Sequence, residues 1–311
     1  MKGFQPKNKR LKIFYLFTLP VVLIILLLVI LTVNFVITSL NVQYKLRDLP
    51  FSVSKEAKMP VIKLDFVPDI SAQGAIIMDA DSKVVLYSKN PYLRFSTAST
   101  TKIMTALTAL AHFKPNDILT VKQASNDGSV LGLMQGQKFT FEDLLYAMLL
   151  PSANDAALAI SQNYPGGEPN FVAKMNEKAH NFQLYNTHYQ DPAGLDDFGD
   201  YTTPFDLARL ASFAVLNPDF KKIVATRQKV ISDIYGNTYD LQNLNILLGV
   251  DGVNGVKTGY TEEAGQVLVT SKLEKGKTII IVVMGSIDRF ADTEKLLDLI
   301  NNNLSYLSIH P

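Results

Sequence analysis

Cysteine is absent from the 311-residue chain, and histidine is scarce. The lack of cysteine excludes thiol catalysis, disulfide bonds and cysteine-ligated metals. The few histidines form no His-Glu-x-x-His pattern or similar ligand pair, so we expect no metal ion and no cofactor. The histidines are His112, His180, His188 and His310.

An excess of charge of one sign is also missing, since 30 basic and 29 acidic residues leave a net charge of +1. A protein that captures nucleic acid through its phosphates relies on a basic excess, so we expect no nucleic-acid partner. There is also no Gly-x-Ser-x-Gly turn and no histidine in the context of a catalytic triad. A reactive serine would therefore need another base.

A long apolar run is what the N-terminus does contain. No charged residue occurs between Ile13 and Tyr44, and the stretch LPVVLIILLLVILTV is almost wholly apolar. A helix needs roughly 20 such residues to cross a bilayer. We therefore expect residues 13–40 to form one transmembrane anchor, which Pro20 bends but does not abolish.

The charges that flank this run predict its orientation. Residues 1–12 carry five basic residues and no acid, whereas the residues after the run mix both signs. Basic residues favour the cytoplasmic side, so we expect residues 1–12 to be a cytoplasmic tail and the remaining chain to lie outside the cell membrane. The alternative is a cleaved signal peptide. Its apolar core would run only about 7–15 residues, and VITSLNVQ offers no small-residue cleavage site, which favours an uncleaved anchor.

Two further segments follow the anchor. Residues 41–72 mix charges with Pro50, Pro60 and Pro68 and show no lasting hydrophobic period, which predicts a stalk. Residues 73–311 carry strand and helix patterns throughout and are expected to form one folded domain.

This domain has strand patterns at both ends and helical patterns between them. GAIIMDADSKVVLYS predicts a hairpin, and GQVLVTSKLE with KTIIIVVMGS predicts a second pair. A further hairpin is expected around Gly236-Asn237. Helices are predicted from Ser99 to Phe113 and in the stretches TFEDLLYAMLL, NDAALAISQNY, PNFVAKMNEKAHNF, TPFDLARLASFAVL and FADTEKLLDLINNNL, with Thr140 and Thr203 as N-caps. The order predicts an α+β fold with an antiparallel sheet flanked by a helical cluster.

The first candidate for chemistry is Ser99 with Lys102, in STTK at the start of the first helical pattern. Residues three apart share a helix face, so the lysine amine can reach the serine hydroxyl. A lysine serves as a base only if burial or positive charge lowers its pKa, and the neighbouring residues Ile103 and Met104 suit a buried amine. Ser52 and Lys55 repeat the spacing in the predicted stalk, where no apolar helix holds them, so the spacing alone is weak.

Two further motifs follow in order. Ser152 and Asn154 stand in LLPSANDAA, at a break between two predicted helices, and a simple helix N-cap is the alternative interpretation. Lys257-Thr258-Gly259 stands in GVNGVKTGYTEEAG, where the pattern predicts an edge strand beside a cleft. A lysine and a threonine there can bind a carboxylate, and the glycine allows a close approach to the backbone. A turn with a surface lysine is the alternative.

The ordered set Ser-x-x-Lys, Ser-x-Asn and Lys-Thr-Gly is that of penicillin-binding proteins and serine β-lactamases. STASTTKIMTAL, LLYAMLLPSANDAA, MNEKAHNFQLYNTHYQDPAGLDD and GVNGVKTGYTEEAG closely resemble the D-alanyl-D-alanine carboxypeptidase family of low-molecular-mass penicillin-binding proteins, over about residues 70 to 300. The resemblance implies a DD-peptidase/β-lactamase-like fold and makes residues 73–311 a catalytic domain. It implies peptidoglycan stem peptides as substrates, β-lactam antibiotics as inhibitors and a role in building the cell wall.

The resemblance also implies a role for each motif residue. Ser99 is expected to be the nucleophile, Lys102 its base, Ser152 a proton relay, and Asn154 the group that holds Lys102 or the substrate backbone. Lys257 and Thr258 are expected to bind the terminal carboxylate of the substrate. The backbone N–H groups of Ser99 and Tyr260, the residue after Gly259, are expected to form the oxyanion hole.

The chain departs from the family pattern at three positions. Many relatives have glycine at Ala153, histidine at Tyr260 and threonine at Leu244. These changes bear on substrate preference and rate. Two alternative functions are a class A-like β-lactamase and an inactive membrane-tethered wall-binding protein. The β-lactamase would need a glutamate base, but Glu168 follows Ser152 too closely and is expected to be an acid at a helix start.

Overall fold

The structure, a computed structural model, describes residues 27–35, 57–63, 67–195 and 199–309. Residues 27–35 are helical, and Lys58–Ile309 form one compact unit. Within the described ranges, no helix is both long and apolar enough to cross a membrane. The predicted cytoplasmic tail and most of the predicted anchor over 13–40 lie outside the described residues.

A five-stranded antiparallel sheet forms the centre of the compact unit, in the order β3-β2-β10-β9-β8. Its hairpins β2–β3 and β9–β10 are the predicted ones, and β8 is the predicted edge strand. Each hairpin turn contains residues with positive φ, as tight hairpin turns require. They are Lys83 in the first hairpin, and Lys275 and Gly276 in the second. The strands are β2 (Gly74–Asp79), β3 (Val85–Lys89), β8 (Val253–Thr261), β9 (Gly265–Glu274) and β10 (Lys277–Ser286).

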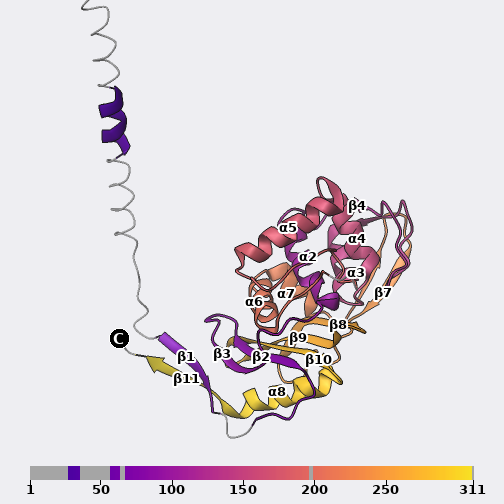
Figure 1. Ribbon diagram of the computed structural model, residues 1–311. Coiled ribbons are helices and arrows are strands. Elements are labelled where there is room, and N and C mark those ends of the chain that lie inside the picture. The colour runs from indigo at the N-terminus through magenta and orange to yellow at the C-terminus, as the bar shows by residue number, and fades with distance from the viewer. Residues whose placement is uncertain (1–26, 36–56, 64–66, 196–198, 310–311) are drawn as a thin grey trace, which may run out of the picture. The chain divides into compact units, whose positions relative to one another are not determined.

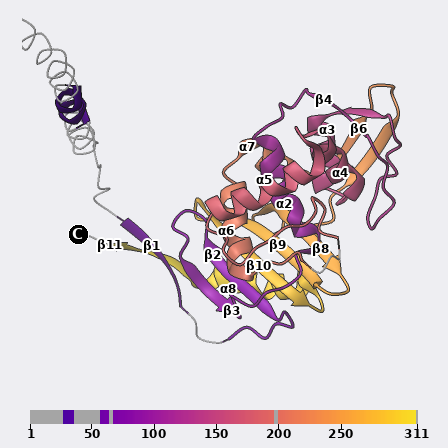
Figure 2. The same ribbon diagram turned by 45° about the horizontal axis from the view of Figure 1, so that its top comes forward.

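Both faces of the sheet are covered, because β2 and β10 are apolar on each side. Along β10, Ile280 and Val282 pack into one core cluster, while Ile279 and Ile281 pack into the other. This alternation follows from the two-residue period of a strand. α8 (Arg289–Asn303) covers one face, and the other helices of the compact unit gather on the opposite face (Figures 1 and 2). The predicted α+β fold, an antiparallel sheet flanked by a helical cluster, is confirmed.

The helical cluster begins with a short 3-10 turn, η1 (Ala98–Thr100), that leads into α2. Its N-caps follow the sequence: the Thr140 hydroxyl accepts from Asp143 N, and the Thr203 hydroxyl accepts from Asp206 N, with a proline at the next position. Glu168 lies in the first turn of α5, as expected. The helices are α2 (Thr101–Leu110), α3 (Phe141–Leu149), α4 (Asn154–Asn163), α5 (Gly167–Asn181), α6 (Pro204–Ala214) and α7 (Pro218–Val224).

Three two-stranded sheets complete the unit. The hairpin β6 (Gln228–Ser232) and β7 (Thr238–Gln242) was expected around Gly236-Asn237. The pair β4 (Ile118–Thr120) and β5 (Lys138–Thr140) was not, since each strand has only three residues. The pair β1 (Ala57–Ile62) and β11 (Leu304–Ile309) joins distant parts of the chain.

The pairing of β1 with β11 changes the description of the predicted stalk over 41–72. Its last part belongs to the compact unit, because β1 is a strand and Ile70 and Ala72 are buried. Residues 41–56 lie outside the described residues. The compact unit therefore begins near Lys58 instead of residue 73. The partner of β1 lies at the other end of the chain, so no local pattern reveals the pairing.

Candidate active site

Ser99 and Lys102 meet at the junction of η1 and α2. Lys102 is fully buried, Ser99 is partly buried, and Lys102 Nζ lies 2.9 Å from Ser99 Oγ. The turn is sharp because Ala98, just before the serine, has a φ of 45°. The i, i+3 spacing thus brings the two side chains together as the sequence predicts.

The Lys102 amine has two further partners, which come from different parts of the chain. Asn154 Oδ1 lies 2.7 Å from Nζ, and the Ala193 carbonyl oxygen lies 2.6 Å from it. Burial lowers the pKa of Lys102 to about 7, although the charges of Asp191 and Asp155 oppose this shift. At neutral pH a large fraction of this amine is therefore uncharged.

The turn that carries the Ala193 carbonyl is held by Asp191. The buried Asp191 carboxylate accepts hydrogen bonds from the backbone N–H groups of Ala193, Gly194 and Leu195 at 2.6, 2.8 and 3.1 Å. Gly194 has a φ of 76°, and a Cβ there would lie 1.8 Å from the Ala98 carbonyl oxygen. Only glycine allows this turn to pack against the serine turn. The three motifs do not indicate the turn held by Asp191, although its residues lie within the stretch YQDPAGLDD.

Ser152 and Asn154 stand in the loop between α3 and α4. Ser152 is buried with a φ of 69°, and its Oγ has no hydrogen-bond partner among the described residues. Asn154 is the first residue of α4 and its Nδ2 donates to the Asp127 carbonyl at 2.8 Å. Neither side chain caps α4, whose N-cap is Ala153 without a side-chain bond, so the N-cap alternative is wrong.

Lys257 comes from β8, on the opposite wall of the site. It is buried, so the surface-lysine alternative is wrong, and its Nζ donates to the Thr258 carbonyl at 2.9 Å. Burial holds the pKa of Lys257 well below its usual value, and the positive charges of Lys102 and Arg289 add to the shift. Because the charge of Lys102 lowers the pKa of Lys257, the two lysines interact electrostatically across the site.

The next residues of β8 run directly past the serine turn. A Cβ on Gly259 would lie 3.2 Å from Ala98 Cβ and 3.4 Å from Ser99 N, so this position leaves little room for a side chain. Thr258 is buried, whereas Tyr260 is 62% exposed. The strand therefore brings the Lys-Thr-Gly-Tyr backbone beside Ser99.

Arg289 also belongs to this wall, and the sequence offered no signal for it. It is the first residue of α8, and its Nη1 donates to the Gly259 carbonyl at 2.8 Å. Its Nε is buried without a hydrogen-bond partner within the described ranges. Burial lowers the pKa of Arg289, although an arginine stays charged at neutral pH.

In the described part of the chain, the Glu168 side chain makes no hydrogen bond to a residue of this site. Burial, helped by the charge of Asp191, raises its pKa. Within the same ranges, no cluster of histidine and acidic side chains could hold a metal ion.

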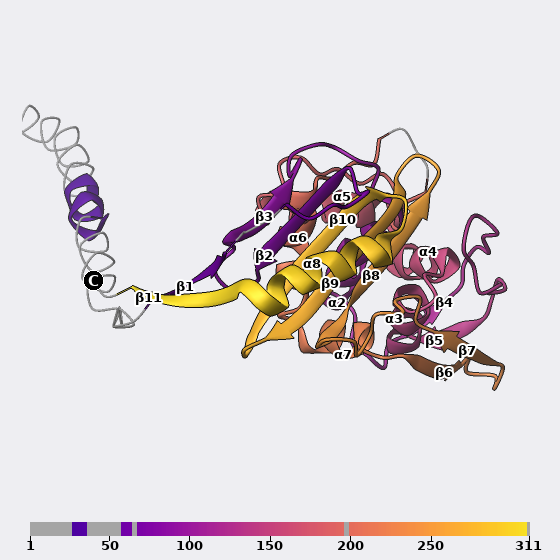
Figure 3. The same ribbon diagram turned by 90° about the horizontal axis from the view of Figure 1, so that it is seen from below.

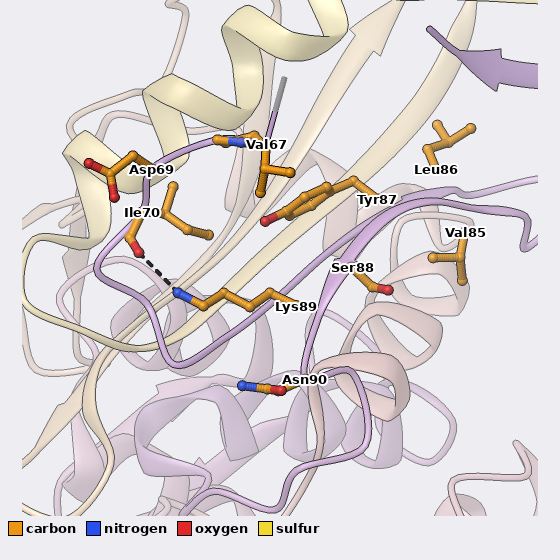
Figure 4. A pocket seen from close by; sticks show the side chains of 10 residues that line it. Val67, Asp69, Ile70, Val85, Leu86, Tyr87, Ser88, Lys89 and Asn90 are labelled. Carbon is orange, nitrogen blue, oxygen red and sulfur yellow. Dashed lines mark hydrogen bonds between the residues drawn. The ribbon is translucent and has the colours of Figure 1, made fainter. Parts of the chain in front are cut away.

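A separate hollow lies at the β3 edge of the sheet, the edge opposite β8. It lies between β3 and the segment 67–70, where Lys89 Nζ donates to the Ile70 carbonyl at 3.0 Å (Figure 4). The hollow contains none of the motif residues, so it is distinct from the site at Ser99.

A serine that meets a buried lysine amine, faced by Lys-Thr-Gly on an edge strand, defines the class of penicillin-binding proteins and serine β-lactamases. Within this class, residues 62–288 match the D-alanyl-D-alanine carboxypeptidase family, and the chain belongs to it. It is a serine-type hydrolase with a DD-peptidase fold, which confirms the resemblance drawn from the motifs.

Three known proteins illustrate the match. The D-alanyl-D-alanine carboxypeptidase DacF of Bacillus subtilis is 34% identical over 73% of this chain, which spans 61% of that relative's length. A D-alanyl-D-alanine endopeptidase of Pseudomonas aeruginosa is 32% identical, and the match covers 76% of this chain and 79% of that relative's length. The crystal structure of the Streptomyces K15 DD-transpeptidase aligns with a TM-score of 0.71 and 34% identity, over 76% of this chain and 98% of that one.

Proposed function

We propose that the protein removes the terminal D-alanine from peptidoglycan stem pentapeptides through an acyl-enzyme on Ser99. The observation that carries this proposal is the environment of Lys102, a fully buried amine with three polar neighbours. The family and its named relatives support the same reaction class.

The three neighbours of Lys102 suit its neutral form. A neutral amine has two N–H groups and one lone pair. Asn154 Oδ1 and the Ala193 carbonyl can only accept, so they take the two N–H groups. The lone pair is then left for the Ser99 hydroxyl, 2.9 Å away. Lys102 can therefore remove the proton as Ser99 Oγ attacks.

The reaction then runs in two steps. Ser99 Oγ bonds to the carbonyl carbon between the two D-alanines, and its proton passes to Lys102. Ser152, whose buried hydroxyl has no other hydrogen-bond partner among the described residues, relays a proton to the leaving amine as the C–N bond breaks. D-alanine leaves, and water hydrolyses the ester to free Ser99.

The strand wall supplies binding for the negative charges. The backbone N–H groups of Ser99 and Tyr260 stabilise the oxyanion. Lys257, Thr258 and Arg289 bind the terminal carboxylate of the substrate, and Gly259 keeps the strand close to Ser99. A β-lactam carries a similar carboxylate beside its reactive amide, so penicillins should acylate Ser99 and inhibit the enzyme.

We also propose that the compact unit from Lys58 onward, which contains the catalytic site, lies outside the cell membrane. Residues 13–40 would form the single-pass anchor, residues 1–12 the cytoplasmic tail, and the residues between the anchor and Lys58 the connection. The apolar run and the basic N-terminal flank support this topology. Protease added to intact spheroplasts should digest the domain, and a chain lacking residues 1–40 should leave the membrane fraction. Protection of the domain would contradict the orientation.

The test of the activity uses the full chain and a pentapeptide that ends in D-Ala-D-Ala. Mass spectrometry should show the loss of one alanine, and fluorescent penicillin should label the protein. Ser99→Ala should abolish both, whereas Ser52→Ala, which changes the serine of the other Ser-x-x-Lys, should leave both intact. If Ser99→Ala still becomes labelled, the assignment of the nucleophile is wrong.

These assays, together with nitrocefin hydrolysis, separate the two alternative functions. A β-lactamase would turn over nitrocefin many times, whereas a carboxypeptidase should stay acylated for long periods. An inactive wall-binding protein would show neither alanine release nor a penicillin adduct.

A further inference from the structure

The chain between β4 and β5, residues 121–137, forms an irregular loop that passes beside α4 (Figure 3). Loops of this length without helix or strand are uncommon in a compact domain and often serve a function. Two of its backbone carbonyls bind Asn154, whose side chain meets Lys102. The Ser129 carbonyl accepts from Asn154 N at 2.7 Å, and the Asp127 carbonyl accepts from Asn154 Nδ2 at 2.8 Å. The loop therefore holds the end of the Asn154 amide that points away from Lys102.

The Asp127 carbonyl decides which end of the Asn154 amide faces the lysine. A carbonyl oxygen only accepts hydrogen bonds, so it must face Nδ2, and Oδ1 is left to accept from Lys102 Nζ at 2.7 Å. In the reversed orientation, an N–H of Asn154 would point at the amine and take up its lone pair. That lone pair would then be lost to Ser99, so the orientation of this amide bears directly on the proposed proton transfer.

Gly128 lets the loop come this close to the amide. It has a φ of 66°, and a Cβ at this position would lie 2.6 Å from Asn154 Nδ2. Asp127, Gly128 and Ser129 are all exposed, so side-chain packing does little to hold them in place. This part of the loop therefore depends on hydrogen bonds for its position.

Those hydrogen bonds come from Asp155, which follows Asn154 in the first turn of α4. Its carboxylate is buried and accepts from Leu131 N at 3.0 and 3.2 Å and from Leu133 N at 2.9 Å. It also accepts from Ala156 N at 3.0 Å, at the helix N-terminus, where a negative charge is favoured. Hydrogen bonds to an ionised acceptor are stronger than those between neutral groups. One carboxylate thus ties the loop to the helix that carries Asn154.

We propose that Asp155 is a positioning residue for the acylation of Ser99. By fastening the loop to α4, it keeps a backbone carbonyl on Asn154 Nδ2, so that Oδ1 faces Lys102 and the amine keeps its lone pair for the serine. Within the described ranges, Asp155 makes no hydrogen bond to Ser99 or Lys102, so it acts through Asn154. The inference rests on the proposed function, because it concerns the same acyl-enzyme.

The charge of Asp155 has a second effect that the experiment must separate from positioning. Asp155 raises the pKa of Lys102, as Asp191 does, and Lys257 interacts with the same amine from across the site. Acylation is therefore measured at about pH 9, where the amine is neutral with or without the Asp155 charge, because the pKa of Lys102 is about 7. Stopped-flow mixing of the full chain with fluorescent penicillin gives the rate.

At this pH, Asp155→Asn should acylate about tenfold to a hundredfold more slowly than the wild-type protein, because an amide turns N–H groups toward the N–H groups of the loop. The same change in an Asn154→Ala background should alter the rate less than about twofold, because the amide that Asp155 positions is then absent. A merely structural role would slow both backgrounds alike. Gly128→Ala should also slow acylation only when Asn154 is present, since its methyl group displaces Nδ2 and leaves Asp155 unchanged.

The matched control is Asp233→Asn. Asp233 is also a buried aspartate that accepts from backbone N–H groups, with Tyr235 N and Asn237 N each 2.9 Å from Oδ1. It holds the turn between β6 and β7 instead of the loop beside Asn154. This variant should acylate at the wild-type rate.

Each outcome supports or overturns the assignment. An unchanged rate in Asp155→Asn, or an equal slowing with and without Asn154, would overturn it. So would a similar slowing in Asp233→Asn, since a general loosening of the fold would then explain the effect. If Asp155→Asn does not fold, an unchanged rate in Gly128→Ala overturns the assignment, and a slowing that depends on Asn154 supports it. If the wild-type protein takes up no penicillin, the proposed function fails, and the inference fails with it.

Discussion

The two walls of the site differ in how many hydrogen-bond partners their basic side chains have. On the helical wall, Lys102 has three polar neighbours and Asn154 uses both ends of its amide. On the strand wall, within the described residues, Lys257 Nζ makes one hydrogen bond and Arg289 keeps a buried Nε without a partner. A buried donor without a partner carries a free-energy cost unless a ligand satisfies it.

This difference assigns a different task to each wall. The helical wall is already arranged for proton transfer, since its contacts favour a neutral amine beside a hydroxyl. The strand wall holds positive charge and spare donors, which a carboxylate would satisfy. Changes in the helical wall should therefore affect kcat, and changes in the strand wall should affect KM.

The largest effect is expected for Lys102→Met, which keeps the shape of the side chain and removes the amine. Acylation by penicillin should slow about 10²–10⁴-fold, because the Ser99 proton then has no base. Stopped-flow labelling measures the rate. The control is Lys55→Met, in the other Ser-x-x-Lys, which should acylate at the wild-type rate. Equal rates for Lys102→Met and wild type would show that another group activates Ser99.

A smaller effect, of a different kind, is expected for Arg289→Gln. The loss of a charged donor should raise KM for the pentapeptide about tenfold or more and change kcat little. Steady-state kinetics separate the two parameters. Arg94→Gln is the control, because Arg94 is exposed and bonds Asn186 away from the site. If kcat falls and KM stays constant, the assignment of Arg289 to binding is contradicted.

The pH dependence should report on the helical wall. Because Lys102 must be neutral to act as a base and its pKa lies at about 7, acylation should speed up as pH rises through that value. The Asp191 charge raises the pKa of Lys102, so Asp191→Asn should move the midpoint to lower pH.

The control for this pH profile is Asp219→Asn, which removes an acid at the start of α7. Its midpoint should equal that of the wild-type protein. A midpoint that stays constant or rises in Asp191→Asn would contradict the electrostatic coupling between Asp191 and Lys102.

Asp292→Asn should change catalysis least and should lower stability instead. Asp292 lies in α8, behind the strand wall. The buried Asp292 carboxylate accepts from Ser71 N and Oγ, Ala72 N and Ser286 Oγ at 2.6 to 2.9 Å. An amide would offer N–H groups to these donors, so the free energy of unfolding should fall by about 1–3 kcal/mol. Urea denaturation measures it, with Glu294→Gln, an exposed position on the same helix, as the control.

The contribution of Asp292 should also depend on pH. Burial alone would raise its pKa, but hydrogen bonds from Ser286 and Ser71 outweigh burial and lower it. A carboxyl whose pKa is lower in the folded state stabilises the fold above its unfolded value of about 4. This stabilisation should be lost as pH falls below that value. An acid unfolding profile identical in Asp292→Asn and wild type would contradict this role.

The local part of the fold could be predicted well from the residues. The hairpins around Asp81 and Lys275, the N-caps Thr140 and Thr203, and the helix start at Ser99 each depend on neighbouring residues. The pairing of β1 with β11 could not be predicted, because its two strands lie at opposite ends of the compact unit and no local pattern connects them. The strands β4 and β5 were not predicted, because each has only three residues.

The same division holds within the site. By itself, the sequence determined which side chains of the three motifs could do the chemistry and, through helical spacing, that Lys102 faces Ser99. Only the tertiary structure decided that the Ala193 carbonyl completes the surroundings of Lys102 and that Arg289 joins the strand wall. The physical reason is that burial lowers the pKa of Lys102 and leaves Arg289 Nε without a partner among the described residues. This burial arises only when distant segments of the chain pack together.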